Sequence, residues 1–166
     1  GPPSPGGLID EIAAYPPSLI GFSVFTETAL NAYQLVERVK PLTEALIVAG
    51  GPHVTALPGE ALDHGVDVVV RGEGEQTLVE LVAAVEARSS LSSVAGLSFR
   101  DERGETEHSR ARALIRPLDV LPSPVDVLDM VPRNWYLASP AKGQLPANLV
   151  TSRGCGGRCT FCSTAV

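Results

Sequence analysis

Three stretches of almost unbroken apolar residues alternate with amphipathic stretches over the first 90 residues. They are "SLIGFSVFT" (18–26), "ALIVAGG" (45–51) and "VDVVVRG" (66–72). Their length suits strands, and a strand that is apolar on both faces is typical of a parallel sheet covered by helices on each side. We therefore predict one buried strand in each stretch.

The segments between and after these strands predict helices. Residues 28–40 place apolar side chains on one helical face, and Pro41 ends the pattern. "PGEALDHG" predicts a short helix that is closed by Gly65. The alternation of strands and helices predicts an α/β domain over residues 1–90, with a Rossmann-like (flavodoxin-like) parallel sheet and helices on both faces.

The helix expected after the third strand covers "TLVELVAAVEA" (77–87). We predict that a capping box from Thr77 to Glu80 opens it. The apolar side chains that we expect to face the sheet recur at helical spacing: Leu78, Leu81, Val82 and Val85.

The pattern changes after residue 90. "AGLSFR" and "ETEHSRARAL" alternate weakly around a turn at 101–104, which predicts a β-hairpin. A proline-rich, irregular stretch follows, and we treat residues 91–145 as a connector. "ANLVTSRGC" then predicts the first strand of a second unit, residues 146–166.

Composition limits the classes of partner. The chain has 166 residues, 44% of them hydrophobic, and a formal net charge of −6, which gives no electrostatic footprint for nucleic acid or an anionic membrane. The apolar runs are too short to span a bilayer, and the start of the chain has no signal-peptide pattern. An odd, clustered set of three cysteines does not suit a secreted disulfide framework, so we expect a reducing, cytoplasmic location.

The loops after the three strands are expected to meet at one edge of the sheet, where parallel α/β folds bind ligands. They read "TET", "GGPHVTALP" and "GEGEQT". Their paired glycines let backbone approach a ligand closely, and hydroxyls and an imidazole lie beside them. The candidate binding residues at this edge are Thr26, Gly50, Gly51, His53, Glu73, Gly74 and Glu75.

A nucleotide is a poor ligand for this edge. "GEGEQT" follows the third strand and lacks the third glycine of a dinucleotide fingerprint. Glu73 and Glu75 would repel a phosphate. A large, flat ligand rich in amide groups fits better, and a purely structural role for the glycines is the alternative. We expect His64, outside these loops, to be a solvated or capping residue at a helix end.

All three cysteines, Cys155, Cys159 and Cys162, lie in the C-x3-C-x2-C pattern of "SRGCGGRCTFC". A structural zinc needs four ligands, and neither a fourth cysteine nor a nearby histidine is present. A disulfide would leave one thiol over. A four-iron cluster held by three cysteines leaves one iron open for a cofactor or substrate, and this interpretation is favoured over zinc and over chance.

These motifs together resemble cobalamin-dependent radical S-adenosylmethionine (SAM) enzymes. "SRGCGGRCTFC" resembles the family's cluster loop, while "GGPHVTALP" and "VDVVVRGEGEQTLVEL" resemble the cobalamin-binding domain that precedes it. The hairpin "GLSFRDERGE" and the segment "RPLDVLPSPVDVLD" resemble the connector. The resemblance extends over roughly residues 18–166, in the family's order.

The resemblance implies three cofactors: a [4Fe-4S] cluster, SAM and cobalamin. Cys155, Cys159 and Cys162 would ligate the cluster, whose open iron would chelate SAM, and Phe161 would pack near the adenine. One-electron reduction would cleave SAM to a 5′-deoxyadenosyl radical that removes a substrate hydrogen, and cobalamin would supply a methyl group. The candidate residues at the sheet edge would line the cobalamin crevice.

Three departures from the family pattern qualify the resemblance. The Asp-x-His-x-x-Gly motif, whose histidine ligates cobalt in many cobalamin domains, is absent, so cobalt would have no histidine ligand. The family's domain has a further β-α-β portion before the first strand found here. The barrel should continue beyond the cysteines, so we expect a truncated barrel and a chain that is inactive alone.

The preferred function is therefore the cofactor-binding portion of a radical SAM enzyme. We expect a methyltransferase, although related enzymes also catalyse cyclisation and ring contraction. The alternatives are a corrinoid carrier module and another flavodoxin-like metabolite-binding domain with a metal-binding tail. Expected partners are a small-molecule or peptide substrate and an electron donor such as flavodoxin or ferredoxin. Neither nucleic acid nor a membrane is expected.

Overall fold

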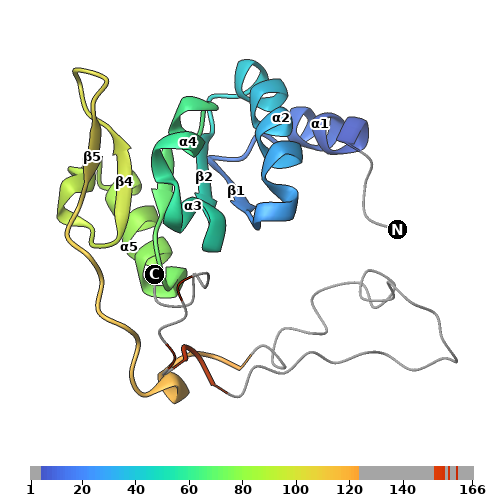
Figure 1. Cartoon of the computed structure of the whole chain (residues 1–166). Coiled ribbons are helices and arrows are strands. Elements are labelled where there is room, and N and C mark those ends of the chain that lie inside the picture. Colours follow the sequence, from blue (N-terminus) through green and yellow to red (C-terminus); the bar gives the residue numbers. More distant parts are fainter. Residues whose placement is uncertain (1–4, 124–151, 156, 158–159, 161–166) are drawn as a thin grey trace, which may run out of the picture.

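A computed structural model describes residues 5–123, 152–155, 157 and 160, and its centre is a five-stranded sheet (Figure 1). The strands follow the order β1-β2-β3-β4-β5 across the sheet. β1, β2 and β3 are parallel, whereas β4 and β5 are antiparallel to their neighbours. Their bounds are β1 Leu19–Ser23, β2 Leu46–Gly50, β3 Val68–Val70, β4 Leu97–Arg100 and β5 Thr106–His108. All three strands predicted in the first 90 residues are confirmed.

Helices connect the parallel strands. The α-helices are α1 Pro5–Ala14, α2 Ala29–Val39, α3 Pro52–Ala56, α4 Pro58–Asp63 and α5 Gly74–Glu86. Short 3-10 helices cover Thr26–Thr28, Lys40–Leu42, Leu91–Ser93 and Leu118–Val120. The helix α1 was not predicted, because prolines and glycines crowd its start and mask its apolar positions. Gly65 closes α4 with a positive φ of 90°, as expected.

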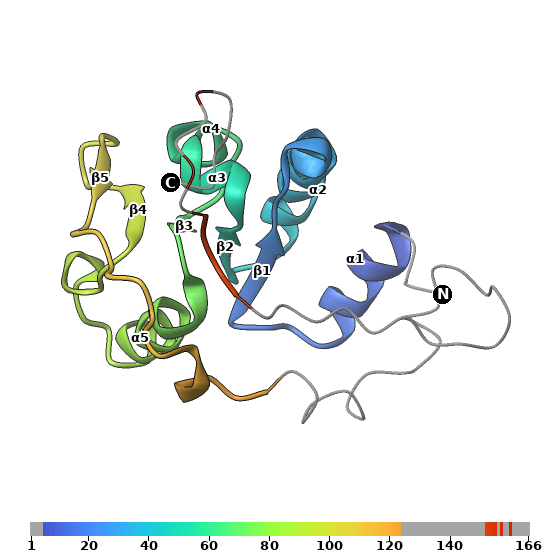
Figure 2. The ribbon, with the colours of Figure 1, turned by 60° about the horizontal axis from the view of Figure 1, so that its bottom comes forward.

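Successive side chains of the central strands point to opposite faces, and each face carries its own apolar core. Ile47, Ala49 and Val69 pack with residues of α2, α3 and α4, and α1 adds Ile9 and Ile12 to this cluster. On the other face, strand residues such as Val68 pack with Leu81 of α5 and with β4. Figure 2 shows α5 across the strands from α3 and α4. Helices on both faces of the sheet are thus confirmed.

The expectation that β1 is buried on both faces is wrong. β1 is an edge strand of the described sheet, and Gly21 and Ser23 are exposed. The α5 core reaches β1 only through Leu19, since it centres on β3 and β4. The apolar run predicted the strand correctly but overstated its burial.

The predicted hairpin is confirmed, but it extends the sheet and makes it mixed, where a parallel sheet was expected. Val68 of β3 pairs with Phe99 of β4 in antiparallel register. The Arg71 side chain, directly after β3, donates to the carbonyl oxygens of Leu97 (3.1 Å) and Ser109 (2.6 Å). This arginine ties the hairpin to the end of the parallel core.

The predicted capping box of α5 is wrong, because the helix begins at Gly74 and Thr77 lies inside it. Thr77 is fully buried, and its hydroxyl donates to the Ala95 carbonyl at 3.2 Å. Of the predicted sheet-facing residues, only Leu81 is fully buried; the others are more than a third exposed: Leu78, Val82 and Val85. The helix is therefore rotated towards Thr77 relative to the predicted face.

None of the helices formed by the described residues is long and apolar enough to cross a membrane. Residues 124–145 of the connector and residues 147–151 of the strand predicted at "ANLVTSRGC" lie outside the described residues, and residues 152–155 form no strand. The predicted start of a barrel therefore stays a prediction.

Candidate functional site

The loops that leave β1, β2 and β3 lie against one another at one edge of the sheet. The Val24 amide donates to the Gly50 carbonyl at 2.8 Å, which joins the first loop to the second. Gly51 follows with a φ of 110°, a region that L-residues rarely adopt. A Cβ at Gly51 would lie 2.6 Å from the Val24 carbonyl oxygen, so this close approach requires glycine.

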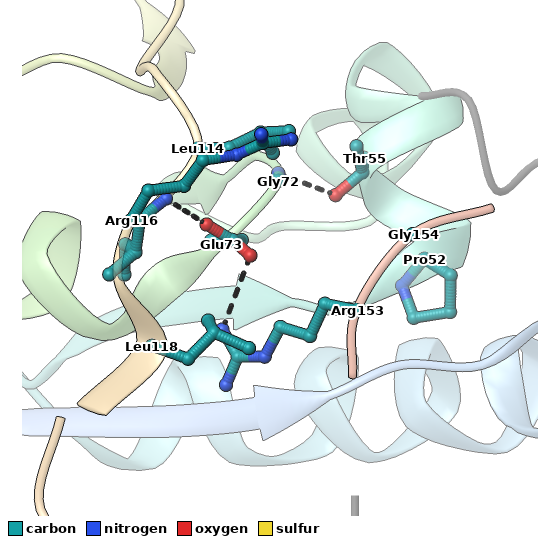
Figure 3. A pocket seen from close by; sticks show the side chains of 11 residues that line it. Pro52, Thr55, Gly72, Glu73, Leu114, Arg116, Leu118, Arg153 and Gly154 are labelled. Atoms are coloured by element: carbon teal, nitrogen blue, oxygen red, sulfur yellow. Dashed lines mark hydrogen bonds and ion pairs between the residues drawn. The ribbon is translucent and has the colours of Figure 1, made fainter. Parts of the chain in front are cut away.

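The second and third loops are joined by Thr55. Its hydroxyl accepts a hydrogen bond from the Gly72 amide at 3.0 Å. A cavity of about 460 Å³ opens between these loops (Figure 3). Its lining comes from the second and third loops, from the connector, and from residues 152–155, which we call the cysteine segment. The lining residues are Gly51, Pro52, Thr55, Gly72, Glu73, Leu114, Ile115, Arg116, Leu118, Arg153 and Gly154.

Two of the predicted binding residues, Gly51 and Glu73, line this cavity. Gly50 ends β2, Gly74 begins α5, and Glu75 is exposed in the first turn of α5. These three residues border the lining without belonging to it, although they lie at the predicted edge.

Thr26 and His53 form a separate pair beside the cavity. The Thr26 hydroxyl lies 3.3 Å from His53 Nδ1, and Glu60 Oε1 lies 3.3 Å from His53 Nε2. The His53 side chain is only 10% exposed. Because both ring nitrogens face protein groups, His53 braces the first two loops against α4.

Glu73 joins three segments of the chain. One carboxylate oxygen accepts from the Ile115 amide at 2.5 Å, and the other lies 3.4 Å from Arg153 Nη1 (Figure 3). Arg153 Nη2 also donates to Glu75. Burial raises the pKa of Glu75, but the Arg153 hydrogen bond and charge, together with a backbone amide, outweigh it and hold that pKa below its usual value.

Sequence reasoning missed most of the cavity wall. Leu114, Ile115, Arg116 and Leu118 come from a stretch interpreted only as connector, and no periodic pattern marks them as a wall. Arg153 was not predicted as part of the cavity wall either. The sequence offered one signal for Arg153: it lies two residues before Cys155, and the predicted site contains the carboxylates of Glu73 and Glu75, with which an arginine can pair.

Comparison with known families identifies the domain that carries this edge. Residues 3–82 match the B12 binding domain. The chain contains a B12-binding domain related to cobalamin-dependent radical SAM enzymes. The recognition made from the sequence motifs is confirmed.

Relatives extend this relation beyond the B12-binding domain. An uncharacterized methyltransferase of Pyrococcus horikoshii is 35% identical over 159 residues, which cover 93% of this chain and 33% of the relative. The cobalamin-dependent radical SAM methyltransferase TokK of Streptomyces tokunonensis is 29% identical over 150 residues, 88% of this chain and 20% of TokK. The chain thus spans a third or less of these relatives.

A solved structure supports the fold. The cobalamin-dependent SAM radical enzyme OxsB, solved with aqua-cobalamin and SAM bound, superimposes with a TM-score of 0.61. The match covers 67% of this chain and 16% of OxsB at 22% identity. At this identity the likeness concerns the fold alone.

No histidine is among the described residues that line the cavity. His64 caps α4, where it stacks on Tyr33 with ring centroids 4.5 Å apart and lies 2.8 Å from Glu37. The expected helix-end role of His64 is confirmed. His108 of β5 lies 2.8 Å from the Ser98 hydroxyl, on the hairpin.

The cavity suits part of a large, amide-bearing ligand. Its volume lies within the usual range for ligand pockets. Gly51 and Gly72 contribute backbone without a side chain to the lining, while leucine and isoleucine from the connector supply apolar wall. Cobalamin combines a flat apolar ring with peripheral amides, so the residues present fit it.

The cysteine pattern is only partly within the described residues. Cys155 is exposed, and its sulfur accepts from the Gly157 amide at 3.3 Å. Cys159, Cys162 and Phe161 lie outside the described residues, so their predicted roles stay predictions. Within the described ranges, no three His, Cys, Asp or Glu side chains are grouped to hold a metal ion.

Proposed function

We propose that this chain is the cobalamin- and [4Fe-4S]-binding portion of a radical SAM enzyme, with methyl transfer as its reaction. The observation that carries the proposal is the cavity at the carboxyl ends of the parallel strands, whose wall includes Arg153 and Gly154 immediately before Cys155. The B12-binding domain and the two residues directly before the first cysteine of the C-x3-C-x2-C pattern therefore line one cavity.

The residues of the chain divide the binding of cobalamin among them. Gly51 and Gly72 let backbone approach the ligand, and the Thr55–Gly72 hydrogen bond fixes the spacing of their loops. Leu114 and Ile115 of the connector form an apolar part of the wall against which the ligand would pack. Thr26, His53, Gly50, Gly74 and Glu75 support these loops. Cobalt receives no imidazole from the described wall.

Cys155, Cys159 and Cys162 would hold three irons of the cluster, with SAM on the fourth, and Phe161 would lie beside the adenine. When bound, these groups supply a carbon radical, and cobalamin supplies the methyl group. The substrate is a small molecule or peptide, and flavodoxin or ferredoxin supplies the electrons. A reducing cytoplasm keeps the cysteines available as thiolate ligands.

Anaerobic reconstitution tests the proposal. The purified chain is incubated with iron, sulfide and hydroxocobalamin and then desalted, and its visible spectrum is recorded. We expect bound cobalamin together with a broad brown absorbance that Cys159→Ala removes. Ser152→Ala is the matched control, because Ser152 is exposed and has no sulfur.

The two cofactors can fail separately. Retained cobalamin without any cysteine-dependent iron would favour the alternative of a corrinoid carrier module. A protein that stays colourless would refute the proposed function for this chain.

A further inference from the structure

Arg153 lies two residues before the first cysteine of the cysteine pattern and reaches back to the B12-binding domain. We propose that Arg153, Glu73 and Glu75 form a clamp that holds the cysteine segment at the mouth of the cofactor cavity. Arg153 is a positioning residue in this proposal, since it acts on the placement of Cys155. The proposal deepens the proposed function and rests on it.

The guanidinium of Arg153 pairs with both carboxylates of the clamp. Arg153 donates from Nη2 to Glu75, and its Nη1 lies 3.4 Å from Glu73 Oε1. The Arg153 side chain is 37% exposed, whereas that of Glu73 is only 15% exposed. A guanidinium suits this site because its planar fork can engage two carboxylates at once, which a lysine ammonium does less well.

The two carboxylates lie close together, and a cation between them reduces their mutual repulsion. Glu73 is the N-cap residue of α5, and Glu75 lies in its first turn, so both charges sit at one helix end. The helix dipole favours negative charge there, but two nearby carboxylates still repel each other. Among the described residues, Arg153 is the basic side chain that contacts both carboxylates.

Glu73 also binds the connector through a backbone amide. Its second oxygen accepts from the Ile115 amide at 2.5 Å. One carboxylate thus fixes the β3–α5 loop, the connector and the cysteine segment around a single cavity (Figure 3). Glu73 thus contacts residues 42 and 80 positions further along the sequence, which gives Cys155 a defined place beside the domain.

Limited digestion with trypsin tests the clamp directly. Trypsin must bind the Arg153 side chain in its own pocket before it cuts the Arg153–Gly154 bond, so the arginine has to leave Glu73 and Glu75 first. When opening is fast relative to cleavage, the cleavage rate follows the population of the open form. We expect Glu75→Gln to raise the rate at this bond about tenfold, because it removes a charge-assisted hydrogen bond.

An internal control cleavage site and a control variant accompany this test. Cleavage after Arg103, at the exposed tip of the hairpin, should not change in any variant. Glu86→Gln removes an exposed charge from the far end of α5 and should leave the rate at Arg153 as in the wild type. Arg153→Lys keeps a trypsin site and one positive charge, so it should retain part of the protection and fall between wild type and Glu75→Gln.

Salt provides a second readout on the unmodified protein. Raising ionic strength from about 0.05 M to about 0.5 M screens ion pairs of this exposure, so wild-type cleavage at Arg153 should accelerate. Glu75→Gln should respond less than the wild type, because only the Arg153–Glu73 pair remains to be screened. Equal cleavage rates at Arg153 in wild type, Glu75→Gln and Arg153→Lys, with no effect of salt, would overturn the clamp. The digestion uses the full chain without cobalamin or iron, so a negative result is distinct from a failure to bind cofactor.

Discussion

Replacing Gly51 by alanine tests whether the cavity depends on the close approach of the first two loops. Gly51 has φ 110° and ψ 173°, a combination that is almost confined to glycine. The new methyl group would also lie 2.6 Å from the Val24 carbonyl oxygen, so backbone must move. Strain in the dihedrals and the overlap together should cost about 2–4 kcal/mol of unfolding free energy.

The assay is urea unfolding followed by far-ultraviolet circular dichroism, with cobalamin retention as a second readout. Gly59→Ala is the matched control, because Gly59 lies in α4 and an added Cβ there meets nothing within 4 Å. That substitution should leave stability unchanged or raise it by up to about 1 kcal/mol. Only Gly51→Ala should weaken cobalamin binding. The reasoning is refuted if Gly51→Ala unfolds at the same urea concentration as the wild type with an unchanged slope.

Three further substitutions test the packing around the site. Leu81→Ala should lower the unfolding free energy by about 2–4 kcal/mol in urea, because Leu81 of α5 is fully buried against the sheet. Thr77→Val should cost about 1–3 kcal/mol in the same assay, since it leaves the Arg112 Nε donor, now 2.7 Å from the hydroxyl, without its acceptor. Burial, followed by the nearby Glu60 carboxylate, raises the pKa of Tyr33 from 10.0 to about 12. The unfolded chain therefore loses this proton first, and stability should fall between pH 10 and 12 by about 2–3 kcal/mol; Tyr33→Phe should abolish that part of the loss.

Each of these outcomes has a contrary result. Leu78→Ala, at a 42% exposed position of the same helix, should cost far less than Leu81→Ala, and equal costs would contradict the observed orientation of α5. Wild-type stability after Thr77→Val would mean that another acceptor serves Arg112. An alkaline stability profile shared by wild type and Tyr33→Phe would show that Tyr33 does not carry the raised pKa.

The parallel core could be predicted because its strands are apolar on both faces, as Val68 and Val69 illustrate. The rotation of α5 could not, because Thr77 packs inward. Its hydroxyl finds the Ala95 carbonyl and the Arg112 side chain, partners that only the folded chain brings near. A polar residue with such partners looks like a cap or a surface position in sequence.

The meeting of the three loops at one edge was predicted correctly, but the composition of the cavity wall was not. Gly51 carries a local signal, since paired glycines after a strand indicate a close approach. Ile115 carries none, and Arg153 carries only its place beside the cysteine pattern, because the role of both depends on contacts with Glu73 across long stretches of sequence. Glu73 and Glu75 were interpreted as groups facing a ligand, whereas Glu73 also binds the connector and both carboxylates bind Arg153.

Equilibrium dialysis of the chain against hydroxocobalamin tests whether the cavity is a cobalamin site. We expect saturable binding of about one cobalamin per chain, weakened by Gly51→Ala but not by Gly59→Ala. We also expect the electron paramagnetic resonance spectrum of the bound cobalt(II) form, prepared with ¹⁵N-labelled protein, to show no hyperfine splitting from a protein nitrogen. The reason is that no histidine lines the described cavity wall. Absence of saturable binding, or equal binding by wild type and Gly51→Ala, would show that the cavity is not the cobalamin site.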